Sequence, residues 1–158
     1  MDFEHESHEK AYEKVGKYLE EAFGTGFTAV PEAPVYVGVQ GSCMVHVVVY
    51  PWGSDDAVVN VRSWCVMDMG EIPADCLKFL LTENWSFRFG AFSVDTDGDI
   101  AFEHTITAGK LDREELEASV KAVLSTADEY DNRIVSEWGG VTAREKALNA
   151  AKEAGLVS

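Results

Sequence analysis

The sequence contains few basic residues. Its 158 residues include 13 Lys and Arg against 28 Asp and Glu, which gives a net charge of −15 at pH 7. The phosphates of nucleic acids and of anionic membranes would repel such a surface, so we expect neither as a partner. The charge favours basic partners, although a merely solvated acidic surface and a halophilic origin are alternative explanations.

Long apolar runs are also absent. No stretch of about 18 uncharged apolar residues occurs, so the sequence predicts no transmembrane helix. The first residues, "MDFEHESHEKAYEK", are acidic and lack the positive and apolar regions of a signal peptide. We therefore expect a cytoplasmic protein.

Cysteine is rare, and its spacing is uninformative. Cys43, Cys65 and Cys76 form no CxxC motif, and the last two lie in the apolar stretches "VRSWCVM" and "ADCLKFLL". We expect buried, reduced thiols rather than disulfide, zinc or catalytic cysteines.

The motifs of common enzymes are missing as well. The sequence contains no GxSxG, GxGxxG or GxxxxGK[ST] pattern. His5 and His8 are three residues apart, whereas the zinc motif HExxH requires a spacing of four with the glutamate between. His46 and His104 are isolated on predicted strands. We expect no catalytic activity, no cofactor and no metal.

The acidic stretch "SVDTDGDIAFEH" (residues 93–104) resembles a calcium loop only at first sight. An EF-hand loop needs glycine at position 6 and glutamate at position 12. Counted from Asp95, the glycine falls at position 4; counted from Asp97, it falls at position 2 and Ala108 takes position 12. Asp97–Gly98 between two alternating hydrophobic runs instead predicts a β-hairpin.

This hairpin sets the register of the strand that follows it. Side chains alternate between the two faces of a strand. We expect Phe102 and His104 to lie beneath the helices and Glu103 to point outward.

Helical periodicity appears in three segments and in the tail. Residues 8–23 have apolar side chains at helical spacing and end at Gly24. Residues 71–85 place Pro73 at the predicted first helical position. Residues 112–138 begin at the expected N-cap Asp112 and end before two glycines. Residues 141–158 are Ala-rich and predict a short terminal helix.

Strand periodicity fills the intervening segments. Residues 34–51 and 55–68 supply three β-branched strands, and residues 87–94 and 99–106 supply two more. The predicted fold class is α+β, an antiparallel sheet in the order α-β-β-β-α-β-β-α plus a short C-terminal helix.

One face of this sheet is the candidate binding site. Val45, Val47 and Val49 share the face expected to meet the helices. Aromatic and arginine side chains, which are enriched at binding hot spots, share the opposite face. The candidate partner-binding residues are Tyr50, Trp64, Phe92, Arg62, Arg88 and His46. The alternatives are that the tail or a second copy covers these side chains, that they are scattered singly, or that a one-residue slip at a bulge swaps the faces.

Several segments carry a family resemblance. They are "VVVYPWGSDDAVVNVRSWCVMDMGEIP", "LTENWSFRFGAFSVDTDGDIAFEHTI" and "LDREELEASVKAVLSTADEYDNRIVSEWGG". With the element order, they resemble the YbjN-type proteins, which share a fold with type III secretion chaperones of the Tir-chaperone kind. The resemblance runs from the first helix to Gly140, which divides the chain into a domain (residues 1–140) and a helical tail (residues 141–158).

The resemblance implies a function through binding. Type III secretion chaperones are small, acidic, usually dimeric proteins that hold an effector segment in extended form. We therefore expect a non-catalytic, chaperone-like domain that binds a protein or peptide on its sheet and helix surface, and we expect a homodimer. One alternative is a regulatory or structural domain that uses the face for self-association. A metal-dependent enzyme built on the aspartates is a third hypothesis.

Overall fold

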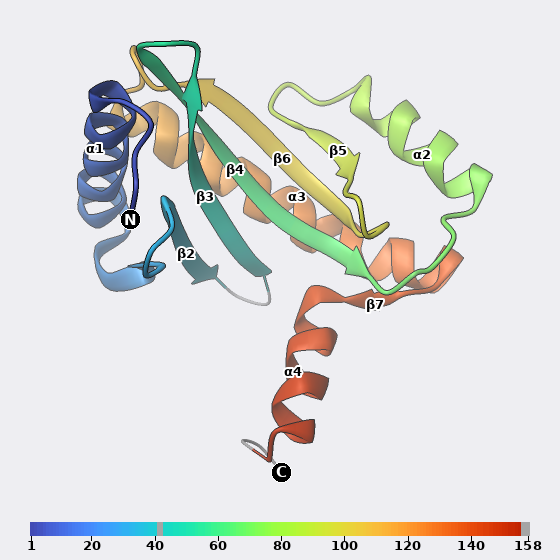
Figure 1. The fold of residues 1–158 in the computed structure, drawn as a ribbon. Helices are drawn as coiled ribbons and strands as arrows, with labels where there is room; N and C mark the ends of the chain where they lie inside the picture. The colour runs from blue at the N-terminus through green and yellow to red at the C-terminus, as the bar shows by residue number, and fades with distance from the viewer. Residues whose placement is uncertain (41–42, 156–158) are drawn as a thin grey trace.

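An antiparallel sheet runs through the molecule, and helices cover one of its faces (Figure 1). The computed structural model describes residues 1–40 and 43–155. The elements, in chain order, are α1 (Glu6–Phe23), a 3₁₀ turn (Gly24–Gly26), β1 (Phe27–Ala29), β2 (Val35–Gln40), β3 (Cys43–Trp52), β4 (Asp56–Met67), α2 (Ala74–Asn84), β5 (Ala91–Val94), β6 (Ile100–Thr107), α3 (Arg113–Trp138), β7 (Val141–Thr142) and α4 (Ala143–Glu153).

The strands lie in the order β1-β2-β3-β4-β6-β5, all neighbours antiparallel, and β7 pairs with the end of β4. The predicted α+β class and the order of its main elements are confirmed. Two short strands, β1 and β7, were not predicted. With three and two residues respectively, they are too short to show an alternating pattern. The division of the chain at Gly140 stays a prediction.

The hydrophobic core lies between the sheet and the helices α1 and α3. Val45, Val47 and Val49 are fully buried, as their alternation predicts. Helix α3 contributes an apolar stripe, formed by Leu116, Val120, Val123, Ala127 and Ile134 and interrupted by the buried Asp131. None of the helices within the described residues combines the length and the apolar character that crossing a membrane would require.

The helix starts follow local hydrogen-bond chemistry. The carboxylate of Asp112 accepts a hydrogen bond from the backbone N–H of Glu115 at 2.8 Å, which confirms the predicted N-cap. Pro73 is itself the N-cap of α2, so the prediction that it is the first helical residue was wrong by one position. The missing N–H of proline is tolerated at either position, because neither position donates an intrahelical hydrogen bond.

The two N-terminal histidines have structural roles. His5 Nδ1 accepts the backbone N–H of His8 at 3.1 Å and so caps α1. His8 is buried, and its Nε2 lies 3.0 Å from the carbonyl oxygen of Val49, which ties α1 to β3.

The predicted hairpin between β5 and β6 is confirmed. Gly98 N–H donates to the carbonyl of Asp95 at 3.2 Å, and Asp95 N–H donates to the carbonyl of Asp99 at 3.0 Å. Within this loop only Gly98 adopts a positive φ, of 83°, so the loop is a type I turn followed by a left-handed glycine.

Helix α4 stands apart from the rest of the molecule. It follows β7 and projects from the body beyond the ends of β3 and β4 (Figure 1). In α4, whose residues are all described, no side chain is buried. Its first turn is closed by a capping box, in which Thr142 and Glu145 exchange hydrogen bonds.

Candidate functional site

The face of the sheet away from α1 and α3 is exposed, and we call it the open face. Register places on it alternate residues of the central strands: Val35, Val37, Val39, Met44, His46, Val48, Tyr50, Val58, Asn60, Arg62, Trp64, Glu103 and Thr105. Val39 is 66% exposed, Tyr50 42% and Met44 40%, whereas the valines on the other face of β3 are fully buried. Large apolar side chains that solvent can reach on one contiguous face are typical of an interaction surface.

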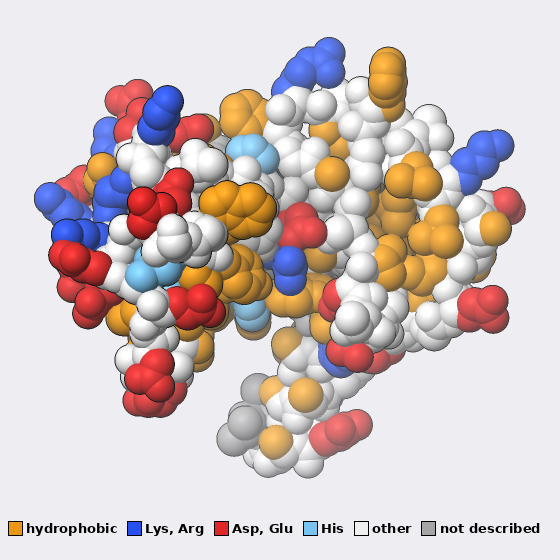
Figure 2. Space-filling view, turned by 45° about the horizontal axis from the view of Figure 1, so that its top comes forward, with side chains coloured by type: hydrophobic (Ala, Val, Ile, Leu, Met, Phe, Trp, Pro, Cys, Tyr) orange, Lys and Arg blue, Asp and Glu red, His pale blue; other side chains and the backbone are white. Residues whose placement is uncertain are grey.

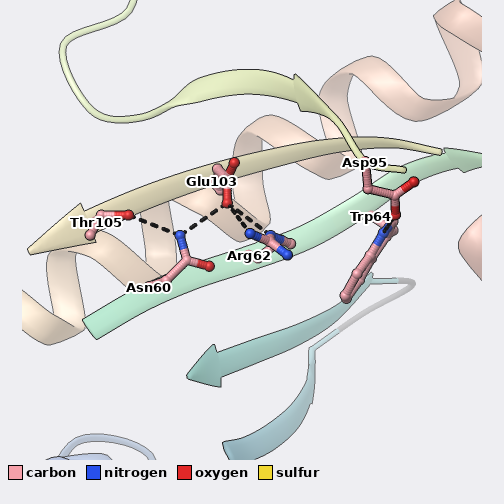
Figure 3. Close-up of polar contacts among 6 residues, drawn as sticks. All are labelled: Asn60, Arg62, Trp64, Asp95, Glu103 and Thr105. Carbon is pink, nitrogen blue, oxygen red and sulfur yellow. Dashed lines mark hydrogen bonds and ion pairs between the residues drawn. The ribbon is translucent and has the colours of Figure 1, made fainter. Parts of the chain in front are cut away.

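A stripe of polar side chains crosses this face (Figure 3). Arg62 donates two hydrogen bonds from Nε and Nη2 to one carboxylate oxygen of Glu103, at 2.8 and 2.6 Å. Asn60 Nδ2 donates to the same oxygen at 3.0 Å and to Thr105 Oγ1 at 2.9 Å. The stripe joins β4 to β6 and presents fixed polar groups beside the apolar ones.

The electrostatics of the stripe follow from its hydrogen bonds. Burial acts to raise the pKa of Glu103, but hydrogen bonds from Ser93, Arg62 and Asn60 and the charge of Arg62 outweigh it, so the pKa is lowered. Asn60 Oδ1 is buried and has no hydrogen-bond partner among the described residues. Because its amide nitrogen must face the Glu103 carboxylate, the oxygen keeps its acceptor capacity for another group.

Trp64 lies at the centre of an aromatic and charged group. Its indole N–H donates to Asp95 Oδ2 at 3.0 Å (Figure 3). The His46 ring meets the Trp64 ring edge-on at 4.9 Å, and the Arg62 guanidinium lies 5.7 Å from the ring centroid. Burial and the charge of Arg62 lower the pKa of His46, so its imidazole is neutral at pH 7.

Four of the six predicted residues share the open face: His46, Tyr50, Arg62 and Trp64. The placement of Phe92 there was wrong. Phe92 is 7% exposed, pairs in register with Phe102, and packs edge-to-face against Phe87, Phe102 and Tyr130 in the core. The physical reason is the turn of the hairpin, which sets Phe92 opposite a residue that already faces the helices.

The placement of Arg88 on the sheet was also wrong. Gly90 has a φ of 74° and interrupts the predicted strand, so β5 begins only at Ala91. Arg88 lies in the preceding loop, is exposed, and donates to the carbonyl of Ser86 at 2.9 Å. The expected directions of Phe102, His104 and Glu103 are confirmed, since Phe102 is buried, His104 Nδ1 lies 2.8 Å from Ser119 Oγ on α3, and Glu103 joins the open face.

A groove of about 610 Å³ separates α4 from the end of the open face. Its lining is mainly apolar and comes from β2, β3, β4 and α4: Val39, Cys43, Met44, His46, Trp64, Met67, Ala143, Arg144, Lys146, Ala147, Leu148 and Ala150. Sequence reasoning missed this groove because it depends on where α4 points, and no local pattern encodes that direction.

A second polar group lies on the helix side, near the same end of the sheet. Cys43 Sγ and carboxylate oxygens of Asp128 and Asp131 lie within 4.8 Å of one another, a spacing that can hold a metal ion. Burial raises the pKa of Asp131, and nearby Asp128 and Glu145 add to this shift. A cation that bound here would have to displace any proton held by Asp131, because a metal ligand must be deprotonated.

The loop aspartates do not form such a group. Asp95 Oδ1 accepts the backbone N–H groups of Asp97 and Asp99, each at 3.0 Å, and Asp99 Oδ1 accepts that of Asp68 at 3.0 Å. These carboxylates stabilise turns. Cys43, Cys65 and Cys76 are buried, as predicted, and no disulfide joins them.

The architecture is that of a binding scaffold: helices on one face of an antiparallel sheet and an exposed, partly aromatic face on the other. Comparison with solved structures gives the same fold. The crystal structure of the ExsC–ExsE complex superposes with a TM-score of 0.60 at 14% identity, covering 84% of this chain and 96% of the other. The Yersinia pestis type III secretion chaperone SycH, in complex with a stable fragment of YscM2, gives 0.52 at 13% identity, covering 75% and 98%.

The model of the TY-Chap1 family, described as T3SS (YopN, CesT) and YbjN peptide-binding chaperone 1, matches residues 9–146. The chain belongs to this family. Curated protein sequences give no match. The predicted family and the predicted chaperone-like, protein-binding character are therefore confirmed, and the family description names peptide binding and no reaction.

Proposed function

We propose that this protein is a chaperone that holds a segment of a client protein against the open face of its sheet. One observation carries the proposal: the open face presents exposed large apolar side chains beside a fixed polar stripe. Apolar side chains of the client would contact Tyr50 and Trp64. Backbone pairing at an outer strand of the sheet would add affinity.

The charge of the chain supports a basic client. Its net charge of −15 would steer a positively charged segment toward the surface and suppress acidic partners. Figure 2 shows charged side chains, many of them acidic, crowded over α1 at the left, and hydrophobic side chains toward the middle of the view. Acidic surroundings and apolar anchors together favour a segment that is basic with interspersed hydrophobic residues.

A reducing compartment suits this chain. Cys65 and Cys76 are buried thiols outside any disulfide, and disulfides are uncommon in cytoplasmic proteins. We place the protein in the cytoplasm on this ground.

Capture of the client tests the proposal. Tagged wild type, Tyr50→Ala and Trp64→Ala would be incubated with extract of the source cells at native salt, and the bound proteins compared by quantitative mass spectrometry. Lys110→Ala is the control, because it also shortens an exposed side chain, in the loop before α3 and away from the open face. We expect the two face variants to lose the same bound proteins that the control retains. Equal recovery of bound proteins by wild type and all three variants would show that the open face is not the client site.

A second proposal concerns self-association through α2. Leu77, Leu81 and Trp85 follow one another at steps of four residues, and Leu81 and Trp85 are 71% and 90% exposed. Exposed Phe89 and Val94 lie nearby in the chain, and β5 is an outer strand of the sheet. We propose that a homodimer forms through this stripe, which would leave the open face free for the client.

The mass in solution tests the dimer. Multi-angle light scattering should give twice the chain mass for wild type and the single mass for Trp85→Glu, while Lys78→Glu, an exposed change on the same helix, should stay dimeric. A monomeric wild type would reject the dimer and would leave the proposal for the open face intact. A dimer that survives Trp85→Glu would place the interface elsewhere.

A further inference from the structure

We infer that the groove beneath α4 is a second docking site, which takes a client segment with aliphatic side chains flanking one acidic residue. This inference rests on the proposed chaperone function and deepens it, because it names a chemistry that the overall charge would not predict.

The groove is built by defined contacts rather than by a loose tail. Val141 and Thr142 pair with the end of β4, and Lys146 Nζ lies 2.9 Å from Asp68 Oδ1, so α4 is held at two points. Gly140 has a φ of 81°, and a Cβ there would lie only 2.6 Å from Val66 Cγ1. This close approach directs the chain across the end of the sheet and sets α4 beside it.

Small side chains on α4 keep the groove open. Ala143, Ala147 and Ala150 all line it, at the four- and three-residue steps that place them on one face of a helix. Across the space lie Met44, Trp64 and Met67 of the sheet. The volume of about 610 Å³ is within the usual range for ligand pockets, roughly 300–1,000 Å³.

The charge of the lining is opposite to that of the molecule. The chain has 28 acidic residues, yet none of the described residues that line the groove is acidic, whereas Arg144 and Lys146 do line it. Lys146 is engaged with Asp68, while Arg144 makes no ion pair or hydrogen bond within the described part of the chain. His46 is neutral at pH 7, because burial and the charge of Arg62 lower its pKa.

An apolar groove with one available guanidinium selects a carboxylate among apolar neighbours. Arg pairs with carboxylates through two parallel hydrogen bonds, and it does so more strongly where water is partly excluded. Methionine and alanine walls accept aliphatic side chains of varied shape. Because Trp64 lies on the open face and also lines the groove, one client segment would run from the face into the groove.

Two peptides test the inference. Each has about 12 residues, with leucines at positions i, i+3 and i+4, and the pair differs at one following position, Glu in one and Lys in the other. Binding of the fluorescently labelled peptides to the full chain is measured by anisotropy. We expect the Glu peptide to bind about tenfold more tightly, against the order that the net charge of the protein alone would give.

Variants of α4 then assign the binding to the groove. Arg144→Glu should reverse the order of the two peptides, while Lys110→Glu, at an exposed site near the opposite end of β4, should leave it unchanged. Ala147→Trp, which fills the groove, should weaken both peptides about tenfold, whereas Asn149→Trp, outside the lining, should not. Circular dichroism checks that α4 stays helical in each variant.

The outcomes separate this inference from the proposed function. Three results would each contradict the groove as a docking site. They are that neither peptide binds wild type, that Arg144→Glu leaves the order of the two affinities unchanged, or that Ala147→Trp does not weaken binding. If Tyr50→Ala then still abolished client capture, the open face would stand without it. The opposite result is that peptides bind the groove as expected while Tyr50→Ala and Trp64→Ala both recover the client as wild type does. This result would reject the open face as the client site and leave the groove as a docking site.

Discussion

The indole nitrogen of Trp64 donates a hydrogen bond to the carboxylate of Asp95, at 3.0 Å, and so links β4 to the loop between β5 and β6. The other oxygen of the same carboxylate accepts the backbone N–H groups of Asp97 and Asp99. Asp95 therefore closes the hairpin and fixes the orientation of the largest aromatic side chain in the middle of the open face. The acidic stretch that resembles a calcium loop therefore has a structural role, since it positions Trp64.

Replacing Trp64 by phenylalanine should raise the pKa of Asp95. The hydrogen bond from Trp64 is the largest cause that lowers this pKa, followed by the backbone hydrogen bonds of Asp99 and Asp97. A carboxylate with a lowered pKa in the folded state stabilises the fold above its unfolded pKa, and this stability is lost as the pH falls through the folded pKa. We expect Trp64→Phe to lower the free energy of unfolding by about 0.5–1.5 kcal/mol at neutral pH. The difference in stability from wild type should shrink in acid, where Asp95 is protonated in both proteins.

Carbon-detected NMR titration of the Asp95 carboxyl and urea unfolding between pH 3 and pH 7, roughly the range in which Asp carboxyls titrate, give both readouts. Trp52→Phe is the matched control, because Trp52 is exposed at the end of β3. An unchanged Asp95 titration in Trp64→Phe would contradict the role of the hydrogen bond.

Replacing only one partner of the ion pair between Arg62 and Glu103 should lower the free energy of unfolding more than replacing both. Their side chains are 27% and 24% exposed, so either one left alone would be a partly buried charge. Arg62→Met should raise the pKa of Glu103 and destabilise the fold by about 1.5–3 kcal/mol at neutral pH. Adding Glu103→Leu should recover part of this loss, and unfolding of the double-mutant cycle measures the coupling. Strictly additive single-variant costs would show that the pair does not interact.

The sequence predicts the parts of this fold that are encoded locally. Alternating valines predict β3 and β4 and the face each presents, and Asp112 predicts the start of α3. The groove and the group formed by Cys43, Asp128 and Asp131 could not be predicted, because they join residues far apart in the chain. Strand periodicity assigns faces but does not say which distant element stands beside a strand end.

The error on Phe92 came from the length of the hairpin loop. A two-residue turn at Asp97–Gly98, the usual loop for an Asp-Gly pair, would set Phe92 opposite Glu103 and so on the open face. The structure instead has a three-residue loop that pairs Asp95 with Asp99 and sets Phe92 opposite Phe102, and directly opposed residues share a face. The error on Arg88 has a separate cause, because the backbone of Gly90 interrupts the strand before Arg88.

Truncating Phe92 should therefore destabilise the protein rather than act only on binding. Its ring packs edge-to-face against three aromatic neighbours, so Phe92→Ala leaves a cavity and should cost about 3–5 kcal/mol in urea unfolding. Phe89→Ala, at a half-exposed aromatic of the preceding loop, should cost much less. A Phe92→Ala variant of wild-type stability that lost its client would instead return Phe92 to the binding surface.

Alanine at Gly140 should loosen α4, and the neighbouring glycine offers a close control. Gly139 and Gly140 both have a left-handed φ, of 94° and 81°, so an added Cβ is strained at either position. Only at Gly140 would that Cβ also collide, 2.6 Å from Val66 Cγ1 and 3.0 Å from the carbonyl oxygen of Met67; nothing lies within 4 Å of it at Gly139. We expect Gly139→Ala to lower the free energy of unfolding by about 1 kcal/mol and Gly140→Ala to lower it by about 2–3 kcal/mol.

Amide hydrogen exchange distinguishes the two variants. Only Gly140→Ala should speed exchange in β7 and α4, because it alone breaks the pairing with β4 that holds the helix beside the groove. Equal exchange in the two variants would mean that α4 is positioned by something other than this close approach.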